Sequence, residues 1–533
     1  MLRLSCLSLR PIFSERFGGT GVNGTPAIEL KHVTKTFGSV VANRDVDMDV
    51  RRGEILAILG ENGSGKTTLM NMIAGIYYPD EGEILIDGEP VVIRSPKDAF
   101  AHGIGMIHQH FKLVDLFTAT ENIILGIREK KYDLRAVAAE VRALCERYGF
   151  ELDPQKKIYE MAVSEKQTVE IIKVLYRGAD ILILDEPTAV LTPQETQKLF
   201  AVLRKMRDDG KSIIIITHKL HEVLSISDRV AILRKGEHIA TVTTADTNEA
   251  ALTELMVGQK VSLNIDRAEP KNTVVRLAVK GLDCMGHEGV KLLDDVTFEA
   301  KSGEILGIAG IAGSGQRELL EAIAGLQHID EGHIAYFDPE TGEEVDLRDK
   351  TPLEIRTLGV RLSFVPEDRL GMGLVGDMDL IDNMMLRSYS YGKSFFLDRD
   401  PPRHLAEDIV ERLGVVTPGV ETPVRRLSGG NVQKVLVGRE ISSAPTVLMA
   451  AYPVRGLDIN SSYLIYNLLN EQKEKGVAVI FVGEDLDVLL ELCDRIMVIG
   501  SGCVTGIVDA RTATKEEIGL LMTKSAHDAG EEE

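Results

Sequence analysis

Short runs of apolar residues recur along this chain, separated by longer stretches of mixed polarity. "EILAIL" begins at Glu54, "ILILD" at Ile181 and "SIIII" at Ser212. Runs this short, nearly continuous and rich in isoleucine and leucine are typical of strands that are covered on both faces of a mostly parallel sheet. The pattern therefore predicts an α/β fold.

Each half of the chain also contains a stretch in which apolar residues recur every three to four positions. Such spacing puts the apolar side chains on one face of a helix. We therefore expect a helical subdomain in each half, with its apolar stripe buried in the core. The residues are Leu134, Val137, Val141 and Leu144 in the first half, and Leu405, Ile409 and Leu413 in the second.

The chain contains an internal repeat. "RGEILAILGENGSGKTTLMNMIAGIYYPDEGEI" begins at Arg52, and "SGEILGIAGIAGSGQRELLEAIAGLQHIDEGHI" begins at Ser302, 250 residues later. A repeat of this length predicts two similar α/β domains in tandem. The expected boundaries are a disordered lead-in at 1–26, a first domain at 27–258, a polar linker at 259–273, a second domain at 274–522 and an acidic tail at 523–533.

The amino-acid composition limits the kinds of binding partner that can be expected. The 533 residues carry 61 Lys and Arg against 82 Asp and Glu, a formal net charge of −21. Nucleic acid and anionic bilayers would repel such a chain, so we expect no nucleic-acid partner. The sequence has no run of about 18 apolar residues, so no membrane span is expected. Five scattered cysteines without a CxxC pair fit a reducing compartment and no zinc site.

A glycine-rich loop lies between a predicted strand and a predicted helix of the first repeat. Residues 60–67 have the sequence GENGSGKT, which matches G-x4-G-K-[ST]. The glycines allow backbone N–H groups to close around phosphate oxygens, and the following helix adds its positive dipole end. We expect Lys66 to reach the β- and γ-phosphates and Thr67 to bind Mg²⁺. The predicted nucleotide-binding residues are Gly60, Glu61, Asn62, Gly63, Ser64, Gly65, Lys66, Thr67 and Thr68.

Polar residues follow several predicted strands. Asp185 and Glu186 end a buried strand, where two carboxylates are costly unless they serve a cation or a reaction. We expect Asp185 to hold Mg²⁺ and Glu186 to orient the attacking water. Gln109 and His218 lie where ligands bind in open α/β sheets, so both are candidates at the γ-phosphate, and Gln109 is also a candidate metal ligand. Phe37 could stack on adenine, or it could simply pack in the core.

One further element points to a family. "RLSGGNVQKVLVGREI", beginning at Arg426, puts Ser428 before a helix whose first turn is Gly429 and Gly430. We expect Ser428 to cap this helix and the glycine N–H groups to face outward toward an anion. Because it follows a phosphate loop and precedes a further apolar strand, this stretch resembles the signature sequence of ATP-binding cassette (ABC) proteins.

The resemblance covers nearly all of residues 28 to 522. It implies two tandem P-loop NTPase cassettes, each with a mostly parallel sheet and a helical subdomain, that bind and hydrolyse ATP with Mg²⁺. In that family two cassettes pair head to tail, so the signature of one covers the γ-phosphate held by the other. Ser428, Gly429 and Gly430 would then complete the site that contains Lys66.

The second repeat lacks most of these chemical groups. The replacements are Lys66 to Gln316, Thr67 to Arg317, Asp185–Glu186 to Ala451–Tyr452, His218 to Glu484 and Gln109 to Glu367. Conversely, Ala162 in the first copy stands where Ser428 stands in the second. In head-to-tail pairing each nucleotide site combines the phosphate loop of one cassette with the signature of the other. All of these replacements, including Ala162, would then fall in the same one of the two sites. Random decay is not expected to spare one whole site, so the sequence predicts one hydrolytic site and one degenerate site.

Within the ABC family, this tandem chain, with its segment "ADILILDEPTAVLTPQE" and without predicted membrane spans, resembles the fused ATP-binding subunit of bacterial importers for monosaccharides and nucleosides. The segment "HQHFKLVDLFTATENI" favours the nucleoside type. The resemblance implies two integral-membrane permease subunits, an extracytoplasmic solute-binding protein and a peripheral location on the cytoplasmic face of the inner membrane. A soluble tandem ABC ATPase acting on ribosomes or nucleic acid and an exporter ATPase stay open as alternatives. The acidic composition, the short linker and the degenerate site speak against the first.

Overall fold

The computed structural model describes residues 25–38, 40–108, 111–127, 133–189, 191–258, 265, 267–271, 273–286, 289–311, 313–364, 373–386, 388–389, 397–442, 444–455 and 457–524. The chain forms two compact units. One contains the residues up to 187 together with 201–256, and the other contains 188–200 and the residues after 256. Most of the predicted lead-in and tail lies outside the described residues.

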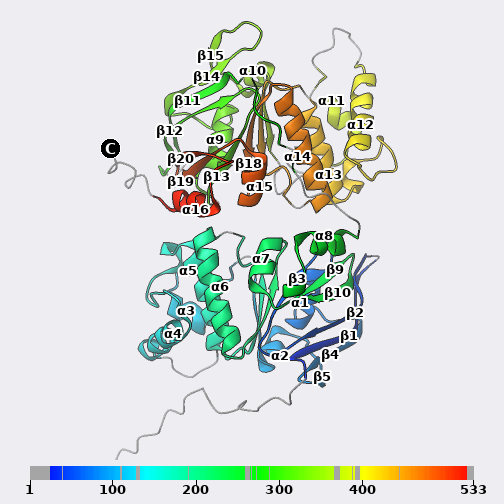
Figure 1. Cartoon of the computed structure of the whole chain (residues 1–533), viewed down its shortest axis with the longest axis vertical. Coiled ribbons are helices and arrows are strands. Elements are labelled where there is room, and N and C mark those ends of the chain that lie inside the picture. Colours follow the sequence, from blue (N-terminus) through cyan, green and yellow to red (C-terminus); the bar gives the residue numbers. More distant parts are fainter. Residues whose placement is uncertain are drawn as a thin grey trace, which may run out of the picture. The chain divides into compact units, whose positions relative to one another are not determined.

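The first unit has two sheets (Figure 1). The smaller, antiparallel sheet has the strand order β2 (Val40–Val50), β1 (Ile28–Phe37), β4 (Glu81–Ile86) and β5 (Glu89–Val91). The larger sheet has the order β10 (Glu237–Thr243), β9 (Arg229–Arg234), β3 (Ile55–Leu59), β8 (Ser212–Ile216), β7 (Ile181–Asp185) and β6 (Ile104–Ile107). Its strands are parallel except β10. All residues of β3, β7 and β8 are buried, which confirms the prediction of strands covered on both faces.

Helices pack around these sheets. They are α1 (Lys66–Ile73), α2 (Pro96–Ala101), α3 (Ala119–Ile124), α4 (Leu134–Tyr148), α5 (Val163–Tyr176), α6 (Pro193–Asp208), α7 (Leu220–Ile226) and α8 (Glu249–Val257), with 3-10 turns at Ile158–Glu160 and Thr244–Asp246. The first residues of α6, up to Phe200, are grouped with the other unit. In Figure 1 the helices α3, α4 and α5 lie at the end of the unit away from β1 and β2. This group is the helical subdomain.

The second unit repeats the same topology. Its antiparallel sheet has the order β12 (Lys291–Lys301), β11 (Val275–Met285), β14 (Glu331–Phe337) and β15 (Glu344–Asp346). Its larger sheet has the order β16 (Val360–Phe364), β17 (Val447–Ala451), β18 (Ala478–Val482), β13 (Ile305–Ala309), β19 (Arg495–Gly500) and β20 (Cys503–Asp509). Its helices are α9 (Gln316–Ile323), α10 (Pro352–Thr357), α11 (Leu380–Met385), α12 (Asp400–Arg412), α13 (Gly429–Ile441), α14 (Ile459–Glu474), α15 (Leu486–Leu492) and α16 (Lys515–Thr523), with a 3-10 turn at Val424–Arg426.

The predicted helical stripes are buried except at Leu134 and Leu405, and Leu405 is half-buried against the core of the second unit. Val137, Val141 and Leu144 of α4 are buried, and Ile409 of α12 is buried as well. The prediction for Leu134 was wrong, because this side chain begins α4 and is 46% exposed. In the predicted linker, Ile265 is buried in the core of the second unit. The linker therefore contains at least one residue with a packing role.

Candidate active site

The phosphate loop follows the buried strand β3 and leads directly into α1. Gly63 and Gly65 have φ values of +79° and +95°, a left-handed conformation that glycine adopts without strain. Gly65 is the N-cap of α1, and no side chain caps that helix end. The first N–H groups of α1 are therefore not bound by a capping side chain, and together with the helix dipole they could bind an anion.

At two positions of this loop there is no room for any side chain, so glycine is required. A Cβ on Gly60 would lie 2.3 Å from the carbonyl oxygen of Leu233, and one on Gly65 would lie 2.4 Å from that of Ala42. Both distances are shorter than real Cβ contacts, and both neighbours are backbone atoms that cannot easily move. The loop therefore keeps its shape only with glycine at these positions.

Lys66 is buried at the start of α1. Its Nζ donates hydrogen bonds to the carbonyl oxygens of Gly60 at 2.6 Å and Glu61 at 3.0 Å. Burial lowers the pKa of Lys66, whereas the charges of Glu186 and Asp185 oppose that shift. The ammonium group is thus held inside the loop, where it can exchange carbonyl oxygens for phosphate oxygens.

The other loop residues differ in exposure. Thr67 and Asn62 are exposed, and Thr68 is half-buried. The buried Ser64 Oγ has no hydrogen-bond partner in the described part of the chain. A buried hydroxyl without a partner is costly, so this atom and the glycine cradle fit a polar ligand such as a nucleotide phosphate.

Asp185 and Glu186 lie at the carboxyl end of β7, as the sequence predicted. Asp185 is buried, and burial, followed by the charge of Glu186, raises its pKa to about 6. Glu186 is paired with His218, whose Nδ1 lies 3.0 Å from Glu186 Oε1. The hydrogen bond with His218 lowers the pKa of Glu186, whereas burial opposes this shift.

Phe37 ends β1 and is 43% exposed, so it is not a core residue. Its ring contacts Tyr77 edge-on, with 5.2 Å between ring centroids. Sequence reasoning did not single out Tyr77, although its place just after α1 was a usable signal. Because Phe37 is exposed, a flat base could stack on its ring. Gln109, and likewise Glu367, lie outside the described residues.

The corresponding site of the second unit has a similar backbone conformation but lacks the charged side chains. Gln316 Nε2 donates to the carbonyl oxygen of Ile311 at 3.1 Å, in the place of the Lys66 ammonium. Tyr452 has a φ of +52°, close to the +46° of Glu186, and its N–H bonds to the carbonyl oxygen of Val482. At these described residues the backbone is preserved and the charged groups are not, so these parts of the two sites differ in chemistry rather than in fold.

The signature segment begins α13, as the sequence predicted, but its cap was predicted wrongly. Ser428 is at the N-cap position, yet its side chain accepts no hydrogen bond from the helix N–H groups. Its Oγ instead lies 3.0 Å from Asn431 Nδ2. The amide of Asn431 therefore takes the hydroxyl oxygen that would otherwise have capped the helix.

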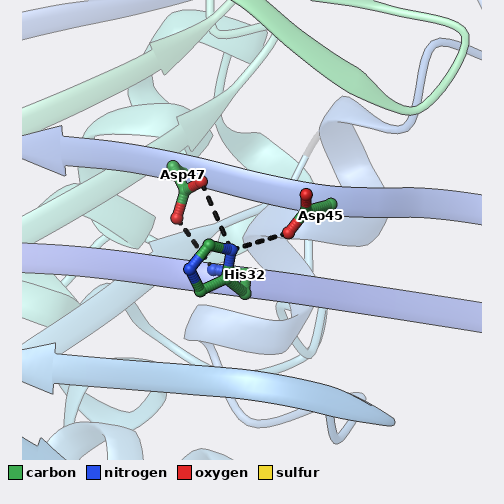
Figure 2. A group of neighbouring side chains, drawn as sticks. All are labelled: His32, Asp45 and Asp47. Carbon is green, nitrogen blue, oxygen red and sulfur yellow. Dashed lines mark hydrogen bonds and ion pairs between the residues drawn. The ribbon is translucent and has the colours of Figure 1, made fainter.

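His32, Asp45 and Asp47 form a cluster of potential metal ligands among the described residues (Figure 2). His32 N–H donates to Asp47 at 2.9 Å, and His32 Nδ1 lies 2.7 Å from Asp45. At the matching bulge of the second unit, Gly281 N–H donates to Thr297 Oγ1 at the same distance. Since the bulge forms there although Gly281 and Thr297 stand in place of His32 and Asp47, we attribute the cluster to strand pairing.

Comparison with known proteins defines the class. The profile of the ABC transporter family matches residues 43–189 and again residues 293–453. The chain therefore belongs to the ABC transporter family, as an ATP-binding protein and ATPase with two tandem cassettes. None of the helices that the structure describes is long and apolar enough to cross a membrane.

Two similar proteins refine this placement, and one solved structure shares the fold. The chain is 42% identical to the nucleoside import ATP-binding protein NupA of Lactococcus lactis subsp. cremoris, over 93% of this chain and 97% of that protein. It is 38% identical to the ribose import ATP-binding protein RbsA 1 of Rubrobacter xylanophilus, over 95% and 99%. The archaeal ribosome recycling factor aABCE1, solved in complex with the ribosomal stalk protein aP1, matches 90% of each chain with a TM-score of 0.56. At 16% identity it is similar in fold alone.

Proposed function

We propose that this chain is the ATP-hydrolysing subunit that powers import of a nucleoside or simple sugar through a pair of integral-membrane permease subunits. Identity to import ATP-binding proteins over nearly the whole length carries this proposal. It favours import over the exporter and ribosome-acting alternatives. An extracytoplasmic solute-binding protein would deliver the substrate, and the chain would be peripheral on the cytoplasmic face of the inner membrane. The two cassettes would be residues 27–258 and 274–522.

The first cassette offers a role for each hydrolytic side chain. Bound Mg²⁺ would neutralise charge on the β- and γ-phosphate oxygens. The Thr67 hydroxyl and the Asp185 carboxylate would hold it, together with Gln109. Lys66 would exchange the carbonyl oxygens of the loop for phosphate oxygens.

Glu186 would act on the attacking water. It accepts a hydrogen bond from that water, while His218 fixes the orientation of its carboxylate. The alignment of both side chains before substrate arrives reduces the entropic cost of reaching the reactive geometry.

The nucleotide sites would be unequal. Gln316 carries no charge, and neither Ala451 nor Tyr452 can replace a carboxylate. Hydrolysis would therefore occur at the site containing Lys66, completed by Ser428, Gly429 and Gly430 in the head-to-tail pairing typical of the family. The degenerate site could still hold a nucleotide through its backbone N–H groups, because they do not depend on lysine.

Reconstitution tests this function. The isolated chain should hydrolyse ATP slowly and without response to added nucleosides or sugars. In proteoliposomes with its permease pair, the substrate-loaded binding protein should stimulate the rate, and Lys66→Ala should remove the stimulation. Tight binding of a nucleoside or sugar to the isolated chain in calorimetry would contradict the proposal, as would stimulation by ribosomes instead of permeases.

A further inference from the structure

Asn431, in the first turn of α13, contacts two parts of the chain at once. Its Nδ2 lies 3.0 Å from Ser428 Oγ and 3.3 Å from the carbonyl oxygen of Val416, and its Oδ1 accepts the N–H of Val416 at 3.1 Å. The N–H of Val416 only donates and its carbonyl only accepts, so these contacts define the orientation of the amide. Asn431 therefore donates a hydrogen bond to Ser428.

This hydrogen bond determines how Ser428 can act. In a usual N-cap the serine oxygen accepts an N–H from the next turn. Here the oxygen accepts from Asn431, and Ser428 makes no capping bond. The hydroxyl proton can then be donated to an acceptor outside the helix. Ser428 and Gly429 are both exposed, so such an acceptor can approach.

The first cassette shows the opposite arrangement at the equivalent turn. Glu165 of α5 stands where Asn431 stands in α13, and its Oε2 accepts the N–H of Ala162 at 2.8 Å. Lys156 Nζ lies 2.7 Å from the same carboxylate oxygen. A carboxylate at that position uses the positive end of the helix dipole and repels a phosphate. The first repeat thus has an ion-paired carboxylate at the start of its helix, whereas the second has a neutral amide that binds the serine.

We propose that Asn431 is a positioning residue for ATP hydrolysis, which holds the Ser428 hydroxyl so that it can donate to a phosphate oxygen and puts no negative charge at the start of α13. The inference rests on the proposed participation of Ser428 in hydrolysis. Asn431 acts through Ser428, and its bonds to Val416 keep the amide in the required orientation.

Two variants of the full chain separate positioning from stability. Asn431→Asp keeps nearly the same shape and still accepts the N–H of Val416, but its second oxygen can donate neither to Ser428 nor to the carbonyl oxygen of Val416. A carboxylate in the first helical turn favours the helix and offsets the lost bond to the Val416 carbonyl, so the melting temperature should change little. The turnover number should nevertheless fall about 10- to 100-fold, as for other residues that orient a functional group. Asn431→Ala should show a similar loss without the added charge.

A double-mutant cycle shows whether Asn431 acts through Ser428. The turnover number is measured for Asn431→Ala, Ser428→Ala and the double variant. Asn431→Ala should lower the turnover number in the wild-type background and change it little in the Ser428→Ala background. Lys434→Ala is the matched control, because Lys434 also bonds from α13 to the neighbouring loop, at the carbonyl oxygen of Gly414, without touching Ser428. It should retain wild-type turnover.

The outcomes distinguish the positioning role of Asn431 from the proposed function of the chain. Equal losses from Asn431→Ala in both backgrounds, or a wild-type rate for Asn431→Ala, would overturn the positioning role. Losses in Lys434→Ala as large as those in Asn431→Ala would show that anchoring of the loop, rather than orientation of Ser428, is what matters. Full activity of Lys66→Ala and Ser428→Ala would instead refute the proposed function itself.

Discussion

The Nδ1 atom of His218 lies 3.0 Å from Oε1 of Glu186, and the two residues follow neighbouring parallel strands of one sheet. The register of β7 and β8 pairs Asp185 with Ile216. The N–H of Glu186 bonds to the carbonyl oxygen of Ile216, and Glu186 has a left-handed backbone conformation. A non-glycine residue in that conformation is strained, which is common at functional sites. The backbone therefore directs this carboxylate toward His218.

Glu186→Gln should separate binding from hydrolysis. The amide is nearly the same size as the carboxylate but cannot act as a base, so turnover should fall roughly 10²- to 10⁴-fold. ATP binding, measured by calorimetry, should persist. Lys66→Ala should weaken that binding, because it removes the ammonium from the loop. Wild-type hydrolysis by purified Glu186→Gln would refute the assignment.

Gly65→Ala should destroy nucleotide affinity. The new Cβ would lie 2.4 Å from the carbonyl oxygen of Ala42 and 2.6 Å from Asn43 Nδ2, so the loop would have to move. Gly149→Ala is the control, since Gly149 has a similar φ of +87° but no atom within 4 Å of the added Cβ. Both variants carry about 1–3 kcal/mol of backbone strain. Only Gly65→Ala should lose ATP binding, and equal affinities in the two would contradict this role of the loop.

Asp80→Asn should destabilise the folded chain by an amount that depends on pH. Asp80 accepts hydrogen bonds from Lys35 Nζ at 2.8 Å and from the N–H and hydroxyl of Thr36 at 2.7 and 2.8 Å. The hydrogen bond from Lys35, and then those from Thr36, lower its pKa from 3.8 to about 2. Because the pKa is lower in the folded chain, the stabilisation is complete above about pH 4 and is lost as the pH falls toward 2.

Thermal melts of the wild type and Asp80→Asn at several pH values check this prediction. The difference in melting temperature should be constant from pH 7 to pH 5 and should shrink below about pH 4. A difference that is independent of pH down to the lowest value at which the chain is folded would show that the carboxylate charge is not responsible.

The parts of the site that depend only on residues adjacent in the sequence could be predicted from the sequence. The buried strands and the loop from Gly60 to Thr67 are local patterns, and the structure places them as predicted. The order of polar residues after strands indicated Glu186 and His218, but their contact depends on the register of β7 and β8. That register is a property of the whole sheet.

Two predictions failed, one because a neighbouring side chain competes with the expected cap and one because the residue lies at the end of its helix. Ser428 has the sequence of an N-cap, yet Asn431, anchored at Val416, takes its hydroxyl oxygen. Leu134 fits the helical stripe but lies in the first turn of α4, where it is 46% exposed. The contact of Tyr77 with Phe37 was missed because it joins the segment after α1 to the end of a strand 40 residues earlier in the chain.

The central claim is that one chain hydrolyses one nucleotide per cycle at a single site that contains Lys66 and Ser428. The most direct test traps the transporter with a phosphate-like transition-state mimic and counts the diphosphates bound per chain. The account predicts one trapped diphosphate, none after Lys66→Ala or Ser428→Arg, and little change after substitution of Gln316. Two trapped diphosphates per chain, or normal trapping by Ser428→Arg, would contradict it.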